Sequence, residues 1–198
     1  MRTTNPRRRL SGYTLVEVMI SVAVVAVVAG MALPSFEPDV ATKLQSFAEI
    51  VAADLNTARS LAVAHNSSYR ITFEPSSNRY YLSHAGSNSA LNVLPKSVFR
   101  TSADTTTQHY TDLDDVPQMG ADARLAVAEA QRSPATGVTY VEFGPLGSTT
   151  ETADIVVWLE SGAGSKALYI GIHINPTTGL SEVQPMTSTR PTTLASGS

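Results

Sequence analysis

The spacing of apolar residues changes twice along the chain. An almost continuous apolar run covers residues 18–33 and stops at Pro34. Between residues 40 and 62, apolar side chains recur every three or four positions, which is the spacing of one face of an α-helix. Beyond Asn66 the spacing becomes two, as in half-buried strands. The pattern therefore predicts two helical segments followed by a β-rich region, an α+β fold.

The first apolar segment is long enough to cross a bilayer. Residues 13–33 would extend about 31 Å as a helix at ~1.5 Å per residue. Residues 1–12 before it carry four arginines and no acidic residue. Basic residues beside a first apolar segment stay in the cytoplasm, so we expect everything after Pro34 to be exported. Gly30 and Pro34 predict a kink or local melting of the helix.

A lone carboxylate, Glu17, stands at the start of this segment, five residues past Gly12. A charge costs roughly 2.5 kcal/mol or more at a bilayer centre and less near its edge, so it implies a partner. The stretch Gly12-Tyr-Thr-Leu-Val-Glu17 resembles the class III signal of type IV prepilins and pseudopilins. The resemblance implies that a prepilin peptidase cuts between Gly12 and Tyr13 and that Tyr13 is then N-methylated. It also implies that Glu17 pairs with the N-terminal amine of a neighbouring subunit.

Two other interpretations of this N-terminus account for less of it. A secretory signal would be cut after its apolar core, where the small residues 29–32 form only a weak site. A plain signal anchor explains the arginines and the apolar run but gives no role to Gly12 or Glu17.

The remainder of the chain is predicted as one amphipathic helix and several strands. The helix covers residues 40–65, and its apolar stripe either packs on the chain's own domain or, in a minority interpretation, forms a coiled coil with a partner. A hairpin is expected at residues 69–73 and 79–83, around a turn at 74–78. Further strands are expected at residues 98–100, 138–143, 154–159, 167–174 and 180–184. Residues 101–137 are polar and irregular, with a short helix expected at 122–132. The Thr-, Ser- and Pro-rich residues 186–198 are expected to be a disordered tail.

Three downstream signals resemble those of the minor pseudopilin H and FimT family. The helix end Ala58-Arg59-Ser60-Leu61-Ala62 is similar to an Ala-Arg-Ser-x-Ala-like helix end of that family. Phe143, Pro145 and Gly147 match its F-x-P-x-G turn, and Gly179 lies in a closing strand–turn–strand. The resemblance implies a pilin-like fold, in which a long N-terminal helix packs with its second half on an antiparallel sheet.

Charge and composition limit the classes of function that the chain can have. All 17 acidic residues follow Gly12, and the formal net charge of the whole chain is −3. This balance argues against nucleic acid as a partner. There is no cysteine. The four histidines are far apart in the sequence (His65, His84, His109 and His173), which gives no metal-ligand spacing. Acidic residues at 112, 114 and 115 lack the glycine and distal Glu of a calcium loop, so we expect a solvated loop there.

The sequence shows no nucleophile with a positioned base and no phosphate loop, so we expect a non-enzymatic protein without a cofactor or metal. The resemblance implies a minor pilin or pseudopilin subunit of a type II secretion pseudopilus or a type IV pilus, anchored in the inner membrane with its N-terminus in the cytoplasm. Its partners would be other pilin subunits, prepilin peptidase, an inner-membrane assembly platform and membrane lipid. The expected parts are a leader (1–12), a transmembrane and assembly helix (13–36), an exported domain (37–185) and the tail.

Two alternatives remain at this stage. A DNA-binding minor pilin of a competence pilus is disfavoured because residues 175–198 contain only one basic residue, Arg190. A membrane-anchored exported domain that never polymerises is the other.

Overall fold

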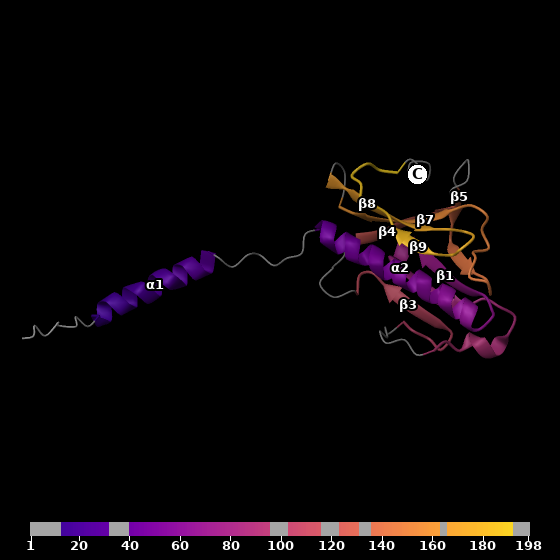
Figure 1. Ribbon diagram of the computed structural model, residues 1–198, viewed down its shortest axis with the longest axis horizontal. Coiled ribbons are helices and arrows are strands. Elements are labelled where there is room, and N and C mark those ends of the chain that lie inside the picture. The colour runs from indigo at the N-terminus through magenta and orange to yellow at the C-terminus, as the bar shows by residue number, and fades with distance from the viewer. Residues whose placement is uncertain are drawn as a thin grey trace, which may run out of the picture. The chain divides into compact units, whose positions relative to one another are not determined.

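The computed structural model describes residues 13–31, 40–95, 103–115, 123–130, 136–162 and 166–191. Its contacts separate the chain into two units, Met1–Glu37 and Pro38–Ser198. In the first unit the described structure is helix α1, Leu15–Met31. The second unit contains helix α2 and the strands (Figure 1).

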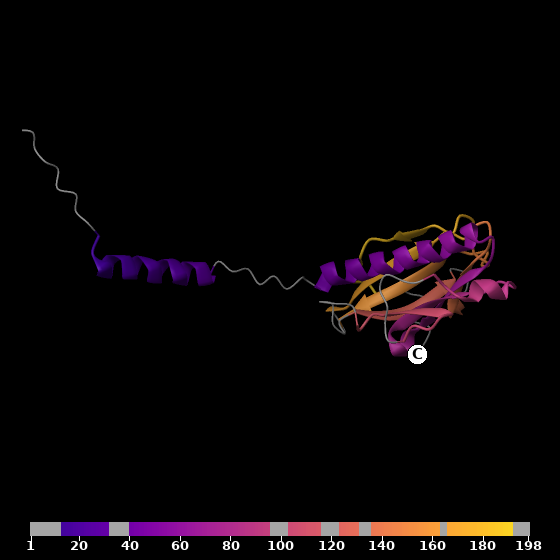
Figure 2. The same ribbon diagram turned by 90° about the horizontal axis from the view of Figure 1, so that it is seen from below.

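Helix α2, Val40–Ala64, buries the apolar stripe that the sequence predicted. Leu44, Phe47, Val51 and Leu55 are fully buried along it, and the stripe ends in small Ala58 and Ala62. Figure 2 shows α2 lying along one side of the sheets. The stripe therefore packs on the chain's own domain. The predicted helix at residues 40–65 is confirmed to within one residue.

The strands form two antiparallel sheets. Sheet A has the order β3-β2-β1-β6, and sheet B has the order β5-β4-β7-β8-β9. The strands of sheet A are β1 (Tyr69–Glu74), β2 (Arg79–His84), β3 (Gln108–Asp112) and β6 (Tyr140–Phe143). Those of sheet B are β4 (Ala123–Ala130), β5 (Thr136–Val138), β7 (Ile155–Ser161), β8 (Leu168–Ile174) and β9 (Ser181–Val183). Two short 3₁₀ turns are η1 (Pro75–Ser77) and η2 (Ser89–Asn92).

A single apolar core lies between α2 and the two sheets. Strand β1 alternates between buried and half-buried residues, with Tyr69, Ile71 and Phe73 in the core. Sheet B contributes alternate residues of β7 and β8 in the same way, such as Ile155 and Ile172. Burial of these side chains against α2 is the main stabilising term of the domain. The expected α+β fold, with a helix packed on antiparallel sheet, is confirmed.

The expected helix at residues 122–132 is wrong. Residues Ala123–Ala130 form strand β4, which pairs with β7 along its length and with β5 on its other edge. The alanine-rich sequence favours helix locally. β4 pairs with β7 from Ala123 to Ala130 and with β5 over its last three residues, 128–130, and these tertiary hydrogen bonds override the helix propensity.

The predicted strand at residues 138–143 is in fact two strands in different sheets. Strand β5 ends at Val138 in sheet B, and β6 begins at Tyr140 in sheet A. The carbonyl of the intervening Thr139 accepts a hydrogen bond from the Phe73 amide at 2.8 Å. Continuous alternation of side chains does not reveal such a change of sheet. Strand β3 was also missed, because its polar sequence carries no apolar alternation.

The chain remains ordered beyond the expected boundary at residue 185. Met186 packs against the core, and Thr187 forms an isolated bridge with Tyr169. The prediction of disorder is therefore wrong for these two residues, and residues 192–198 lie outside the described part of the chain. The short strand expected at residues 98–100 lies outside it too.

Candidate functional site

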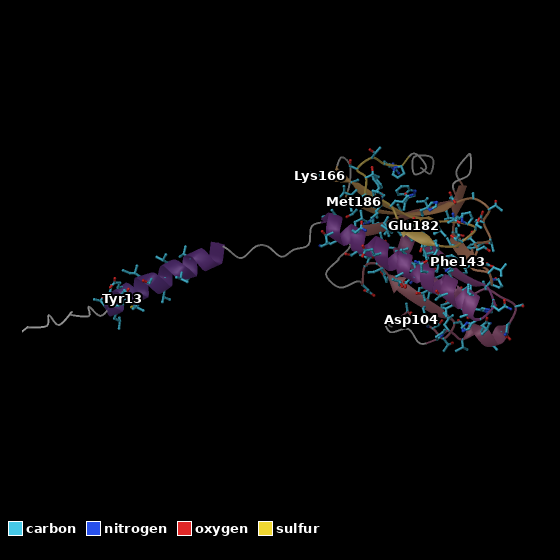
Figure 3. The ribbon with its side chains drawn as sticks, viewed as in Figure 1. Tyr13, Asp104, Phe143, Lys166, Glu182 and Met186 are labelled. Atoms are coloured by element: carbon cyan, nitrogen blue, oxygen red, sulfur yellow. The ribbon has the colours of Figure 1, made fainter. Side chains whose placement is uncertain are left out.

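The start of α1 is fixed by residues that follow Gly12. The Glu17 amide donates to the Thr14 carbonyl at 3.1 Å and to the Thr14 hydroxyl at 3.3 Å. Thr14 is therefore the N-cap, and Glu17 stands three residues later, at the position that a glutamate takes in a capping box. The helix begins with residues that a cut after Gly12 would leave in place. Figure 3 shows Tyr13 at this end of α1.

Glu17 lies in the first turn of α1, where the helix dipole favours a negative charge. Within the described ranges of the chain, no ion pair to its carboxylate is found. Its carbonyl accepts a hydrogen bond from Ser21 Oγ at 2.8 Å. The structure thus gives Glu17 a local role in the helix start that the sequence reasoning did not consider.

The described side chains of α1, residues 15–27, are exposed on every face, as are those of residues 13 and 14 before it. Tyr13 is 82 % exposed, and Leu15 and Met19 are 76 % and 64 % exposed. A helix that is apolar all round is stable only when lipid or other protein covers it. Among the described residues, no helix reaches the combination of length and hydropathy that a membrane crossing requires.

The other predicted N-terminal site residues are only partly described. Gly30 lies inside α1, next to its last residue. Gly12 and Pro34 fall outside the described residues. The expected cleavage site and the expected kink at Gly30 and Pro34 therefore remain predictions.

The structure brings together the three downstream signals that the sequence singled out. Arg59, near the end of α2, donates from Nε to the carbonyl of Thr178 at 2.7 Å. Gly147, at the end of the turn after β6, lies between Arg59 and Val63 on one side and Gly179 on the other. Gly147 and Gly179, which lie 88 and 120 residues after Arg59 in the sequence, thus form one contact cluster with the helix end. We call Arg59, Gly147, Thr178 and Gly179 the turn cluster.

Both glycines of the turn cluster are required by its geometry. Gly179 has φ +65°, and a Cβ there would lie 1.9 Å from the Gly147 carbonyl oxygen. Gly147 has φ +83°, and a Cβ there would meet Arg59 Nε at 3.2 Å. A positive φ favours glycine, and close backbone approach requires it. The cluster locks the end of α2 to two turns of the β region, so its role is structural.

The histidines and the acidic loop serve local structure. His84 binds Ser67 Oγ through Nε2 at 2.7 Å and Asn92 Oδ1 through Nδ1 at 2.8 Å. His173 Nε2 lies 3.3 Å from Asp154 Oδ2. Asp112 accepts from the Asp114 amide at 2.9 Å. In the ranges that the structure describes, no three metal-ligating side chains come together.

The carboxylate of Asp54, in α2, lies against sheet A. Asp54 Oδ2 accepts from Tyr80 Oη at 2.7 Å and from Thr111 Oγ1 at 3.1 Å. Burial raises the pKa of Asp54 above its ordinary value, against the lowering effect of the two hydrogen bonds. Burial, followed by the Asp54 charge, raises the pKa of Tyr80 well above its ordinary value, so Tyr80 remains a donor. No local sequence signal marks this network, because Tyr80 and Thr111 reach Asp54 only through the fold.

Comparison with known proteins confirms that the N-terminus resembles that of pilin-like proteins. Residues 7–33 match the family model described as the prokaryotic N-terminal methylation motif. The predicted resemblance to pilin-like proteins is thus confirmed for this segment, and it covers both sides of the Gly12–Tyr13 bond.

Two solved structures, both of the type IV minor pilin FimU of Pseudomonas aeruginosa strain PAO1, are similar to this chain. For one crystal form, the sequence identity to this chain is 16 % and the TM-score is 0.43. The matched region covers 72 % of this chain and 93 % of the FimU chain. For the other crystal form, the identity and the TM-score are the same, and the matched region covers 73 % of this chain and 89 % of the FimU chain. No curated protein matches the chain.

Proposed function

We propose that this chain is a minor pilin or pseudopilin, a non-enzymatic subunit that enters a filament through α1. It is made as a precursor, anchored in the inner membrane by residues 13–36 with its leader in the cytoplasm and its domain outside. A prepilin peptidase removes residues 1–12, and Tyr13 becomes the methylated N-terminus. The observation that carries the proposal is the methylation motif at residues 7–33, which contains helix α1, whose described apolar side chains are all exposed.

Assembly accounts for that exposed surface. In the inner membrane, lipid covers the apolar side chains of α1, and in a filament the equivalent helices of neighbouring subunits cover them. Glu17 then enters a medium of low dielectric constant, where a carboxylate needs a positive partner. The amine that cleavage creates at Tyr13 of a neighbouring subunit supplies this charge. An assembly platform in the inner membrane would deliver the subunit.

The capping geometry at Thr14 determines how Glu17 should be tested. Replacing Glu17 by Ala removes both the negative charge and the polar side chain at the third position of the capping box. Replacing it by Gln removes the charge but keeps a residue that suits the third position of a capping box. The two variants therefore separate ion pairing from helix capping.

We expect both variants to insert into the membrane and to be cleaved, because cleavage depends on Gly12. We expect both to lose association with the major subunit, at a cost on the order of several kcal/mol for an unpaired buried amine. Association is measured by crosslinking in cells that contain the whole filament machinery. Normal association of Glu17→Gln alone would assign Glu17 to helix capping and contradict the ion pair. Normal association of both variants would mean that Glu17 is not an assembly contact. A precursor that stays uncleaved beside an active peptidase would instead favour an anchored domain that does not polymerise.

A further inference from the structure

Three exposed apolar side chains surround the turn cluster. Leu146 is 90 % exposed, Val63 is 48 % exposed and Leu180 is 47 % exposed. The Val63 side chain lies beside Gly147, because its Cγ2 would be 3.2 Å from a Cβ built on that glycine. Gly179, which precedes Leu180, packs against the Gly147 carbonyl. Three segments that are distant in the sequence therefore present apolar side chains around one point, and we call Val63, Leu146 and Leu180 the distal patch.

The segments that carry the distal patch contain no charged residue. Residues 60–64, 143–149 and 175–181 include no Asp, Glu, Lys or Arg, although these four types make up 16 % of the chain. Arg59, next to the first segment, is half-buried beside the patch. Depletion of charge around exposed apolar side chains and an arginine is typical of the centre of a protein–protein interface. Apolar side chains gathered in this way mark an interaction surface, whereas singly scattered ones are ordinary. The composition thus favours a protein partner over solvent.

The backbone under the distal patch is held by hydrogen bonds. The Gly147 amide donates to the Gly144 carbonyl at 2.9 Å, which closes the turn that carries Leu146. The Thr149 amide donates to the Pro176 carbonyl at 2.9 Å, which joins this turn to the one between β8 and β9. Side chains on a fixed backbone lose less freedom on binding, so the patch suits an interface that forms without rearrangement.

The Arg59 guanidinium indicates the charge of the partner. Its Nε donates to the Thr178 carbonyl at 2.7 Å. In the part of the chain that the structure describes, no carboxylate forms an ion pair with this side chain. An arginine beside an apolar surface pairs well with a carboxylate of the partner, which it can bind through two N–H groups. The complementary surface is therefore apolar and carries an acidic residue.

The distal patch lies at the far end of α2 from the point where the chain enters the domain. Val40 begins α2, and Val63 follows it by about 35 Å along the helix at ~1.5 Å per residue. In a filament whose subunits are all anchored through the same N-terminal segment, neighbouring domains face the same way, so unlike ends meet in a head-to-tail contact. The end that carries the patch then meets the entry end of the domain that lies farther along the filament.

We propose that the distal patch binds the domain of the adjacent filament subunit, with Leu146 in an apolar depression of that subunit and Arg59 against one of its carboxylates. This inference rests on the proposed function, because only assembly through α1 brings such a domain within reach. The contact involves few side chains and is weak by itself, and the common filament raises the effective concentration of the two surfaces. The domain alone is therefore expected to stay monomeric.

The test uses the full-length chain in cells that contain the whole filament machinery. A photoreactive p-benzoylphenylalanine at position 146 should yield, after irradiation, an adduct with another filament subunit, identified by mass spectrometry. Leu146→Asp should lower the amount of the chain in sheared filaments about tenfold, because a carboxylate must then be buried in the apolar contact. The substitution should leave the fold unchanged, since the side chain is 90 % exposed. Val93→Asp is the matched control, because Val93 is 67 % exposed and belongs to none of the three segments. It should enter filaments as the wild type does.

Three results would overturn the proposal while leaving the proposed function intact. The first is entry of the wild type into filaments with no adduct from position 146. The second is an adduct only with lipid or with a protein that is not a filament subunit, and the third is equal entry of Leu146→Asp and Val93→Asp. Failure of the wild type itself to be cleaved or to enter filaments would instead overturn the proposed function, and this inference with it.

Discussion

Replacing Gly179 by Ala should destabilise the domain more than any ordinary surface substitution. The residue is in a turn between β8 and β9 and has φ +65°. A Cβ at this position would lie 1.9 Å from the Gly147 carbonyl oxygen, a backbone atom of a different turn. One of the two turns must move, and the Thr178 carbonyl that accepts from Arg59 lies next to the substituted residue.

The expected loss is the sum of two effects. A left-handed backbone conformation costs a residue with a Cβ about 1–2 kcal/mol. Displacing the Thr178 carbonyl weakens a hydrogen bond to a charged group, which contributes about 1.5–3 kcal/mol when intact. We therefore expect the free energy of unfolding to fall by roughly 2–5 kcal/mol, which corresponds to about 4–20 °C in Tm for a domain of this size.

The measurement is urea unfolding of a fragment that begins at Pro38, followed by circular dichroism. Gly137→Ala is the matched control, because a Cβ there would meet nothing within 4 Å, and its effect should stay within about 0.5 kcal/mol. Gly179→Asn separates the two causes, since Asn66 and Asn78 of this chain already adopt φ +48° and +47°. If Gly179→Asn is as stable as the wild type, the close approach to Gly147 does not exist and the reasoning fails.

Three further predictions concern the leader, the domain and the buried acid. Gly12→Val should block processing by β-branched bulk before the cut, and N-terminal sequencing of the wild type should begin at Tyr13; another start refutes the cleavage site. The fragment from Pro38 should be a monomer by light scattering, because its apolar stripe is covered within its own unit, and aggregation would mean that the stripe needs a partner. Because the pKa of Asp54 is raised on folding, the folded state binds its proton more tightly, so this group's contribution to stability falls as pH rises above about 3.8. Asp54→Asn should therefore gain stability relative to the wild type between pH 4 and 7 in urea titrations, and parallel pH profiles would refute this.

The spacing of apolar residues was sufficient to predict those helices and strands that bury one face. The stripe between residues 40 and 62 predicted α2 almost to the residue, because a helix that packs on a sheet needs apolar side chains every three or four positions. Alternation likewise predicted the hairpin of β1 and β2. The signal around Gly12 and Glu17 was recognisable for a similar reason, since its residues are consecutive and its chemistry does not depend on the folded domain.

The candidate sites of the domain that begins at Pro38 depend on contacts between distant segments. Arg59, Gly147 and Gly179 were singled out as separate signals, and only the fold shows that a Gly147 carbonyl forces glycine at position 179. The contact between Tyr81 and Tyr110 could not be predicted from the sequence, because these residues become neighbours only through strand register.

Sheet order was decided by tertiary structure alone. The segment Ala123–Ala130 prefers helix by composition, yet it forms β4 because β7 pairs with it along one edge and β5 pairs with its last three residues on the other. Residues 138–143 alternate like one strand, yet the chain passes from sheet B to sheet A at Thr139. A sequence specifies the faces of an element through side-chain spacing within that element. The strands that pair with its edges come from distant parts of the chain, and side-chain spacing within the element does not specify those partners.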